Sequence, residues 1–213
     1  MKFEKTEIWG FEHAIRGMRN PLESRKKSDS KWKSFYNELG GHFDSTYEEF
    51  VIGKNDLELS QKLIKAGSEH RKFLRQIFVS VDITAPLYWW KEFDTYKVGT
   101  VANSTSTMHK LASTPITIDC FEHGEWIPET TINNLERLRN CYNLTKDKVV
   151  WKKLIVNLPE SWLQTRTVTM NYENLLSMIN QRKNHKLTEW SVDFIQWAKT
   201  LPYAEELLFL LMN

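Results

Sequence analysis

The stretch Val81–Leu111, VDITAPLYWWKEFDTYKVGTVANSTSTMHKL, decides the fold of this chain. It begins inside Ile77–Ile83, where apolar and polar residues alternate, and this period of two is typical of a β-strand. Ala85-Pro86 then predicts the start of a helix, because proline is well tolerated in the first helical turn. That helix is rich in aromatic residues, including the pair Trp89 and Trp90. The order of strand, turn and helix indicates an α+β protein.

A polar stretch follows the aromatic helix, with five Ser or Thr residues from Thr100 to Thr107. Short hydroxyl and amide side chains offer many hydrogen-bond donors and acceptors in a small volume, as a ligand pocket requires. The same residues also form surface loops that are capped by their own hydroxyl groups. The residues by themselves leave both interpretations open.

The rest of the chain predicts mostly helices and few strands. Helices are expected over Phe11–Arg19, Asp56–Ala66, Ile132–Tyr142, Lys148–Val156 and Tyr172–Asn180, with a helical turn at Ser34–Leu39 and two helices within Thr188–Leu211. Further strands are expected over Lys5–Gly10, Pro115–Phe121 and Thr165–Met170. The prediction is a helix-rich α+β fold, a single domain over residues 1–213 around a small antiparallel or mixed sheet.

Composition narrows the class of function. The net charge is +2, which is too small for a nucleic-acid footprint. No apolar run approaches the roughly 20 residues of a membrane span, and the N-terminus lacks the apolar centre of a signal peptide. The six histidines do not cluster at metal-ligand spacing, so no metal site is predicted. We therefore expect a cytoplasmic protein with no nucleic-acid partner and no membrane partner.

The stretch Val81–Leu111 resembles the signature region of flavin-dependent thymidylate synthases. In that family a strand leads through an Ala-Pro turn into a helix that ends in Arg-His-Arg, and a Ser-x-Asn-Glu-x-Ser-x-Arg-Tyr stretch follows. When the two are aligned on Ala85-Pro86, the Arg-His-Arg falls on Thr95, Tyr96 and Lys97, the first Ser on Thr100, the Asn-Glu on Ala102-Asn103, the second Ser on Thr105, and the Arg-Tyr on Thr107-Met108.

A second block of the resemblance lies downstream. In the family a Leu-Pro leads to an Asn that begins a helix, and an Arg follows about three turns later. Here Leu158-Pro159 leads to Asn171 and then to Arg182 without a gap. The resemblance extends from about Leu63 to Pro202. The chain departs from the family pattern at several charged positions. Of the signature Arg-His-Arg only a positive charge at Lys97 remains, Asn103, Thr107 and Ile155 replace charged residues, and a Glu-His pair on the earlier strand falls on Arg75-Gln76.

The resemblance implies a flavin-dependent thymidylate synthase that methylates deoxyuridylate (dUMP). It implies flavin adenine dinucleotide (FAD) as cofactor, NADPH and methylenetetrahydrofolate as co-substrates, and a homotetramer. Arg182 is the expected catalytic residue, because a fixed cation near the pyrimidine stabilises negative charge on the ring. The open alternatives are a relative that acts on another pyrimidine nucleotide and an inactive nucleotide-binding or structural oligomer.

The same resemblance implies two sets of binding residues. The expected substrate-binding residues are Glu92, Thr95, Asn103, Ser104, Thr105, Ser106, Thr107 and Arg182. The expected cofactor-binding residues are Thr95, Tyr96, Lys97, Asn103, Asn171, Tyr172, Glu173 and Ser177. The assignment requires the hydroxyl-rich stretch and the helix that carries Arg182 to face one shared cavity.

Overall fold

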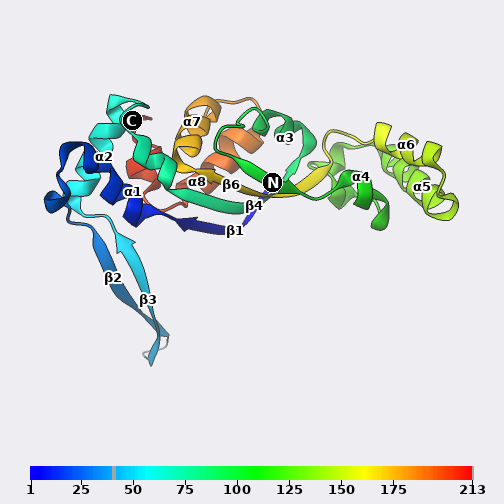
Figure 1. Ribbon diagram of the computed structural model, residues 1–213. Coiled ribbons are helices and arrows are strands. Elements are labelled where there is room, and N and C mark those ends of the chain that lie inside the picture. The colour runs from blue at the N-terminus through cyan, green and yellow to red at the C-terminus, as the bar shows by residue number, and fades with distance from the viewer. Residues whose placement is uncertain (40–41, 213) are drawn as a thin grey trace. The chain divides into compact units, whose positions relative to one another are not determined.

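A computed structural model describes residues 1–39 and 42–212 of the chain (Figure 1). Within these residues helices dominate, and one four-stranded sheet has the order β1-β4-β6-β5. The strands of this sheet are β1 (Lys2–Trp9), β4 (Phe78–Pro86), β6 (Leu163–Asn171) and β5 (Val101–Ser104). The predicted helix-rich α+β class with a small sheet is confirmed.

The chain forms two compact units. Unit 1 consists of Met1–Thr6 and Ser80–Thr169, and unit 2 consists of Glu7–Val79 and Met170–Asn213. The prediction of a single domain over the whole chain stays a prediction. No helix in the described ranges is both long enough and apolar enough to cross a membrane.

Unit 1 contains the aromatic helix and its surroundings. Its helices are α3 (Leu87–Phe93), α4 (Thr107–Lys110), α5 (Glu129–Thr145) and α6 (Lys148–Val156). β5 pairs antiparallel with β6, from Val101 opposite Thr169 to Ser104 opposite Arg166. A cluster of buried apolar side chains packs α5 and α6 against the segment that precedes them; its members are Leu111, Ile116, Phe121, Leu135, Leu138 and Leu154.

The Ala-Pro turn places α3 as the sequence predicted. The first backbone N–H groups of a helix have no partner within the helix, so other groups must accept from them. Here the N–H groups of Leu87 and Tyr88 donate to the carbonyl oxygens of Trp162 and Glu160, both at 3.1 Å. Trp90 is buried, and its indole N–H donates to the Gln164 carbonyl oxygen at 2.9 Å. α3 is therefore held at both its backbone and its aromatic face.

Unit 2 contains the remaining helices and a separate hairpin. Its helices are α1 (Phe11–Met18), α2 (Lys54–Ala66), α7 (Tyr172–Arg182) and α8 (Ile195–Lys199), with π-helical turns at Glu189–Phe194 and Ala204–Leu208. The hairpin pairs β2 (Lys31–Leu39) antiparallel with β3 (His42–Val51). Gly10, at φ 100°, makes the sharp turn into α1, where a Cβ atom would lie 2.2 Å from the Gln76 carbonyl oxygen.

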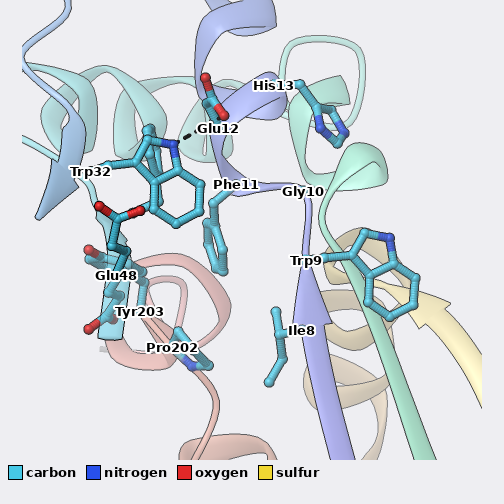
Figure 2. A pocket seen from close by; sticks show the side chains of 12 residues that line it. Ile8, Trp9, Gly10, Phe11, Glu12, His13, Trp32, Glu48, Pro202 and Tyr203 are labelled. Atoms are coloured by element: carbon cyan, nitrogen blue, oxygen red, sulfur yellow. Dashed lines mark hydrogen bonds between the residues drawn. The ribbon is translucent and has the colours of Figure 1, made fainter. Parts of the chain in front are cut away.

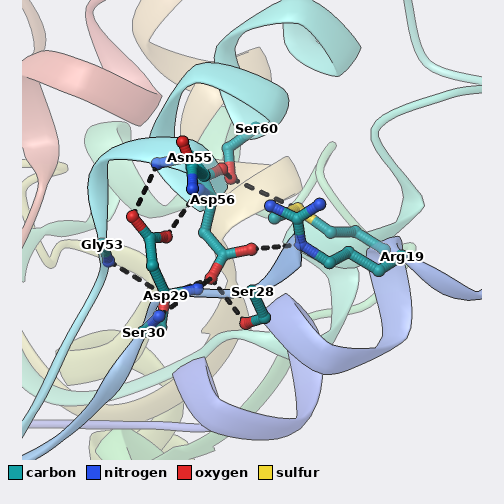
Figure 3. A network of polar contacts seen from close by, with 9 residues as sticks. Arg19, Ser28, Asp29, Ser30, Gly53, Asn55, Asp56 and Ser60 are labelled. Atoms are coloured by element: carbon teal, nitrogen blue, oxygen red, sulfur yellow. Dashed lines mark hydrogen bonds and ion pairs between the residues drawn. The ribbon is translucent and has the colours of Figure 1, made fainter. Parts of the chain in front are cut away.

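A buried ion pair in unit 2 joins Arg19, the residue that directly follows α1, to Asp56 of α2 (Figure 3). The Asp56 carboxylate accepts from the Arg19 guanidinium and from the hydroxyl groups of Ser28 and Ser30. The backbone N–H groups of Asp29 and Ser30 also donate to it, at 3.2 and 3.1 Å. Burial raises the pKa of Asp56, but the hydrogen bonds from both serines and from Arg19 outweigh it and hold the pKa below its ordinary value. Asp56 is therefore a buried, charged and fully hydrogen-bonded centre of unit 2.

Two predicted elements were wrong. Ser34–Leu39, expected as a helical turn, lies in β2, where aromatic cross-strand pairs such as Phe35 and Tyr47 stack at 5.5 Å. Pro115–Phe121, expected as a strand, instead contains a short 3-10 turn at Ile118–Cys120. There Thr117 takes part in a capping box, and local hydrogen bonds of this kind compete with sheet formation.

Candidate functional site

The predicted residues at the end of α3 lie in a turn that leads to β5. The Thr95 hydroxyl donates to the Glu92 carbonyl oxygen at 2.7 Å, and the Thr100 hydroxyl donates to the Tyr96 carbonyl oxygen. These hydrogen bonds fix the backbone of the turn, so both threonine hydroxyls have a structural role in this turn. Lys97 is exposed, and its charge is available to an anionic group.

The hydroxyl-rich stretch forms the edge of the sheet and the turn beyond it. Asn103 and Ser104 are exposed on β5, which is the last strand in the sheet order. Thr105 is also exposed, and its backbone is fixed by its N–H, which donates to the Thr165 carbonyl oxygen at 2.9 Å. The hydroxyl oxygen of Ser106 accepts from the N–H of His109 and caps α4, whose first residue is Thr107. The stretch thus combines local capping with exposed amide and hydroxyl groups.

Arg166 is a charged residue beside this stretch that the sequence reasoning missed. It lies opposite Ser104 on β6, and its guanidinium carbon is 4.2 Å from the ring centroid of Trp90. Its Nη1 pairs with Asp94 at 2.7 Å, and its Nε donates to Gln164 at 3.0 Å. The sequence contains one indication of this residue, because Arg166 lies within the β-prone run TRTVTM. Side chains of a strand alternate between its two faces, so Arg166 is expected on the same face as Gln164 and Val168.

The second group of predicted residues lies on α7 in unit 2. Asn171 is the N-cap: its side chain accepts from the N–H of Asn174, and the Asn174 side chain accepts from the N–H of Asn171. This confirms the predicted start of the helix. Tyr172 is fully buried, and its hydroxyl donates to the Pro202 carbonyl oxygen at 2.7 Å. Burial raises the pKa of Tyr172 far above its ordinary value, so this side chain stays neutral in the core.

Glu173 and Ser177 stand one helical turn apart on the same face of α7. Glu173 is bound by the Arg71 guanidinium at 2.9 to 3.1 Å, through both carboxylate oxygens. The Ser177 hydroxyl oxygen accepts from the Gln181 side chain at 2.9 Å. Glu173 is therefore a paired carboxylate of fixed orientation.

Arg182 is the last residue of α7. Its guanidinium carbon lies 5.1 Å from the ring centroid of Trp190, which is buried. A planar guanidinium on an aromatic face keeps its charge and a defined orientation. Arg182 is partly buried, which suits a cation that acts on a bound ring.

The structure brings the predicted residues together in two groups, one in each unit. Unit 1 holds the group from Glu92 to Thr107, and unit 2 holds the group from Asn171 to Arg182. The prediction that both groups face one cavity stays a prediction. The available chemistry is a set of amide and hydroxyl donors and acceptors with cations at Lys97 and Arg182.

Comparison with known proteins identifies the fold. No protein-family model matches the sequence, and no curated protein matches it. The structure is similar to a flavin-dependent thymidylate synthase ThyX from Helicobacter pylori complexed with FAD and dUMP, with a TM-score of 0.71, 17% identity, and coverage of 98% of both chains. It is also similar to a UMP/dUMP methylase PolB from Streptomyces cacaoi bound with 5-Br dUMP, with a TM-score of 0.63, 13% identity, and coverage of 98% of this chain and 94% of that chain. The chain therefore has the fold of the flavin-dependent thymidylate synthases.

Proposed function

We propose that this protein is a flavin-dependent, thymidylate synthase-like enzyme that methylates dUMP with FAD as its cofactor. The observation that carries the proposal is the similarity of fold along 98% of both chains to a protein complexed with FAD and dUMP. The two signature blocks of the sequence agree with this fold, because β4 runs through Ala85-Pro86 into α3 and because Asn171 caps α7.

The proposal gives the exposed residues of unit 1 the task of binding the nucleotide. Asn103, Ser104 and Thr105 supply amide and hydroxyl groups that suit the carbonyl and N–H groups of a pyrimidine. Lys97 is an exposed point charge that suits a phosphate. Ser106 and Thr107 directly follow this stretch, and Glu92 lies on α3; we assign these three residues to the same task.

The residues of unit 2 act on the flavin and on the pyrimidine ring. FAD supplies the hydride when it is bound. Asn171 and Ser177 would hold the flavin, and the Arg71 guanidinium fixes the orientation of Glu173 beside them. Tyr172 contributes only to the packing of the helix start, because its side chain is buried and its backbone N–H donates to the Ile77 carbonyl oxygen at 2.9 Å. Arg182 stabilises the negative charge that builds on the pyrimidine ring.

The resemblance also carries proposals about the wider reaction. NADPH would be the reductant, and methylenetetrahydrofolate would be the one-carbon donor. The working assembly is a homotetramer, and its location is the cytoplasm.

A second candidate is a relative that acts on another pyrimidine nucleotide. It is favoured by the missing guanidinium groups at Thr95, Thr107 and Ile155, because Thr and Ile cannot copy the bidentate grip of arginine on an anion. The fold similarity to a UMP/dUMP methylase is consistent with this reading. The third candidate is a nucleotide-binding or structural oligomer without catalysis, which the same losses also suit.

A titration of the purified full chain with FAD tests the proposal. We expect a bound flavin with an absorption band at roughly 450 nm, and quenching of flavin fluorescence that saturates. Added dUMP is then expected to perturb the band in the wild type and less in Arg182→Ala. Glu58→Ala, at an exposed position of α2, is the matched control and retains both responses. A protein that binds no FAD at any concentration would contradict both enzyme readings.

Rescue of a thymidine-requiring strain separates the two enzyme readings. Growth without thymidine supports methylation of dUMP. Flavin binding without rescue supports the second candidate, and a direct comparison of UMP, dUMP and dCMP as ligands then identifies the nucleotide.

A further inference from the structure

Unit 2 contains a cavity of about 450 Å³ whose walls combine aromatic rings with carboxylates (Figure 2). This volume lies within the range of small-molecule pockets, roughly 300 to 1,000 Å³. The aromatic members of the lining are Trp9, Phe11, Trp32, Phe50 and Tyr203. None of the residues that line the cavity belongs to the predicted nucleotide and flavin residues, so the cavity is independent of the proposed function.

The aromatic rings of the cavity are held by one another. Phe11 and Tyr203 meet edge to face at 5.5 Å, and Trp32 and Phe50 do so at 5.7 Å. Trp32 is 53% exposed and Trp9 is 44% exposed, so two indoles keep much of their surface open. The face of an aromatic ring carries negative partial charge and attracts cations. A ligand in this cavity therefore meets rigid, electron-rich walls.

Three carboxylates add full negative charge to the same lining. Glu12 comes from α1, and Glu48 and Glu49 come from β3. Glu12 accepts from the Trp32 indole at 3.2 Å, and the nearest nitrogen of Arg16 lies 3.7 Å from its other oxygen. The residues that line the cavity, all of them within the described part of the chain, include neither lysine nor arginine.

The phenol of Tyr203 responds to this negative charge. Burial raises the pKa of Tyr203, and the carboxylates of Glu49 and Glu206 raise it further, against the opposing effect of the hydrogen bond from the Ile52 N–H. That N–H donates to the phenol oxygen at 2.8 Å and fixes the ring in place. The carboxylates of Glu49 and Glu206 therefore lie near enough to the phenol of Tyr203 to act on its charge.

We propose that this cavity binds a small organic cation, with either an alkylated ammonium head or a charged heteroaromatic ring. Such cations are weakly hydrated, so they lose little on leaving water for an aromatic surface. The aromatic rings attract the charge at short range, and the three carboxylates attract it at longer range. Anions are repelled by Glu12, Glu48 and Glu49, and neutral molecules of the same shape gain only from the apolar area.

Calorimetric titration of the purified full chain tests this proposal with two pairs of probes. Choline is compared with its neutral carbon analogue 3,3-dimethylbutan-1-ol, and N-methylquinolinium with 1-methylnaphthalene. We expect at least one cation to bind about tenfold or more tightly than its neutral analogue. Whichever cation binds more tightly identifies the shape of the head group. High salt should weaken the binding of the cation, because screening shortens the reach of the carboxylates.

Variants locate the binding in this cavity. Trp32→Leu is expected to lower the affinity for the cation roughly tenfold, and Glu48→Gln with Glu49→Gln to lower it by a similar factor. The matched controls are Trp126→Leu, at an indole that is 75% exposed in unit 1, and Glu58→Gln on α2, and both should leave the affinity unchanged. Trp32 lies on an exposed hairpin face, and a melting curve for each variant verifies folding. Equal affinity for each cation and its analogue, no binding of either cation, or unchanged affinity in Trp32→Leu would overturn the proposal.

Discussion

Replacement of Asp56 by alanine is expected to destabilise unit 2 by about 3 to 5 kcal/mol, the cost of breaking a buried ion pair from one side. Arg19 is 4% exposed and Asp56 is fully buried, so Asp56→Ala leaves a guanidinium charge without water and without its carboxylate. The hydroxyl groups of Ser28 and Ser30 and the backbone N–H groups of Asp29 and Ser30 also lose their acceptor. Each lost partner adds to the penalty.

The expected loss is a large share of the total stability, which for folded proteins is about 5 to 15 kcal/mol. For a chain of this size, each kcal/mol shifts the melting temperature by roughly 2 to 4 °C, so a decrease of about 6 to 20 °C is expected. Urea unfolding followed by tryptophan fluorescence measures the change in free energy, and calorimetry measures the melting temperature. Glu58→Ala, an exposed carboxylate on the same helix, is the control and should change stability by about 0.5 kcal/mol or less.

The pH dependence of stability gives an independent measurement of the same centre. The pKa of Asp56 is lowered in the folded state, so its charged form stabilises the fold at any pH above the ordinary aspartate pKa of 3.8. This stabilisation is lost as the pH falls below 3.8 through the lower folded-state pKa. Asp56→Ala should remove that part of the acid sensitivity. A loss of stability below about 1 kcal/mol, with an unchanged acid transition, would refute the reasoning.

Three further predictions concern single side chains. Gly10→Ala should destabilise the fold by about 2 kcal/mol or more in urea unfolding, since φ 100° and the Gln76 carbonyl oxygen exclude a Cβ atom. Gly67→Ala is the control, because Gly67 has a similar φ of 108° but open space around it. The difference between the two variants gives the cost of the steric clash apart from the cost of the backbone conformation. Tyr172→Phe should cost about 1 to 2 kcal/mol by thermal melting, because the Pro202 carbonyl oxygen loses its donor; a neutral effect would show that water replaces it. Trp90→Phe should cost about 2 to 3 kcal/mol in urea unfolding, because the indole hydrogen bond to the Gln164 carbonyl oxygen is lost and the smaller ring covers less of the Arg166 guanidinium; retention of the wild-type unfolding curve would contradict that role.

The sequence predicted those elements whose signals are local. The alternation in Ile77–Ile83, the proline before α3 and the asparagine before α7 each act within a few residues, and all three gave correct elements. The prediction for Ser34–Leu39 was wrong because β2 is stabilised by its partner strand β3 and by aromatic pairs across the hairpin. A window that contains only Ser34–Leu39 includes none of these partners.

The candidate site was predictable in part for the same reason. The exposed side chains of Asn103 to Thr105 follow from a polar run, and residue type alone identifies them. The stacking of Arg166 on Trp90 joins residues from different elements, and no local pattern reports it. The cavity around Trp32 and Glu48 likewise forms only when the hairpin, α1 and the C-terminal turns assemble within unit 2.

The order of the two units along the chain has a consequence for synthesis on the ribosome. Unit 2 is built from two segments separated by residues 80–169, and the pair between Arg71 and Glu173 joins positions 102 residues apart. Such a unit cannot close until its second segment has emerged, and bringing distant segments together costs loop-closure entropy. Its first segment must therefore wait, with apolar surface uncovered, while unit 1 is translated. A chaperone that shields residues 7–79 during that interval should raise the yield of native protein more than one that acts after release.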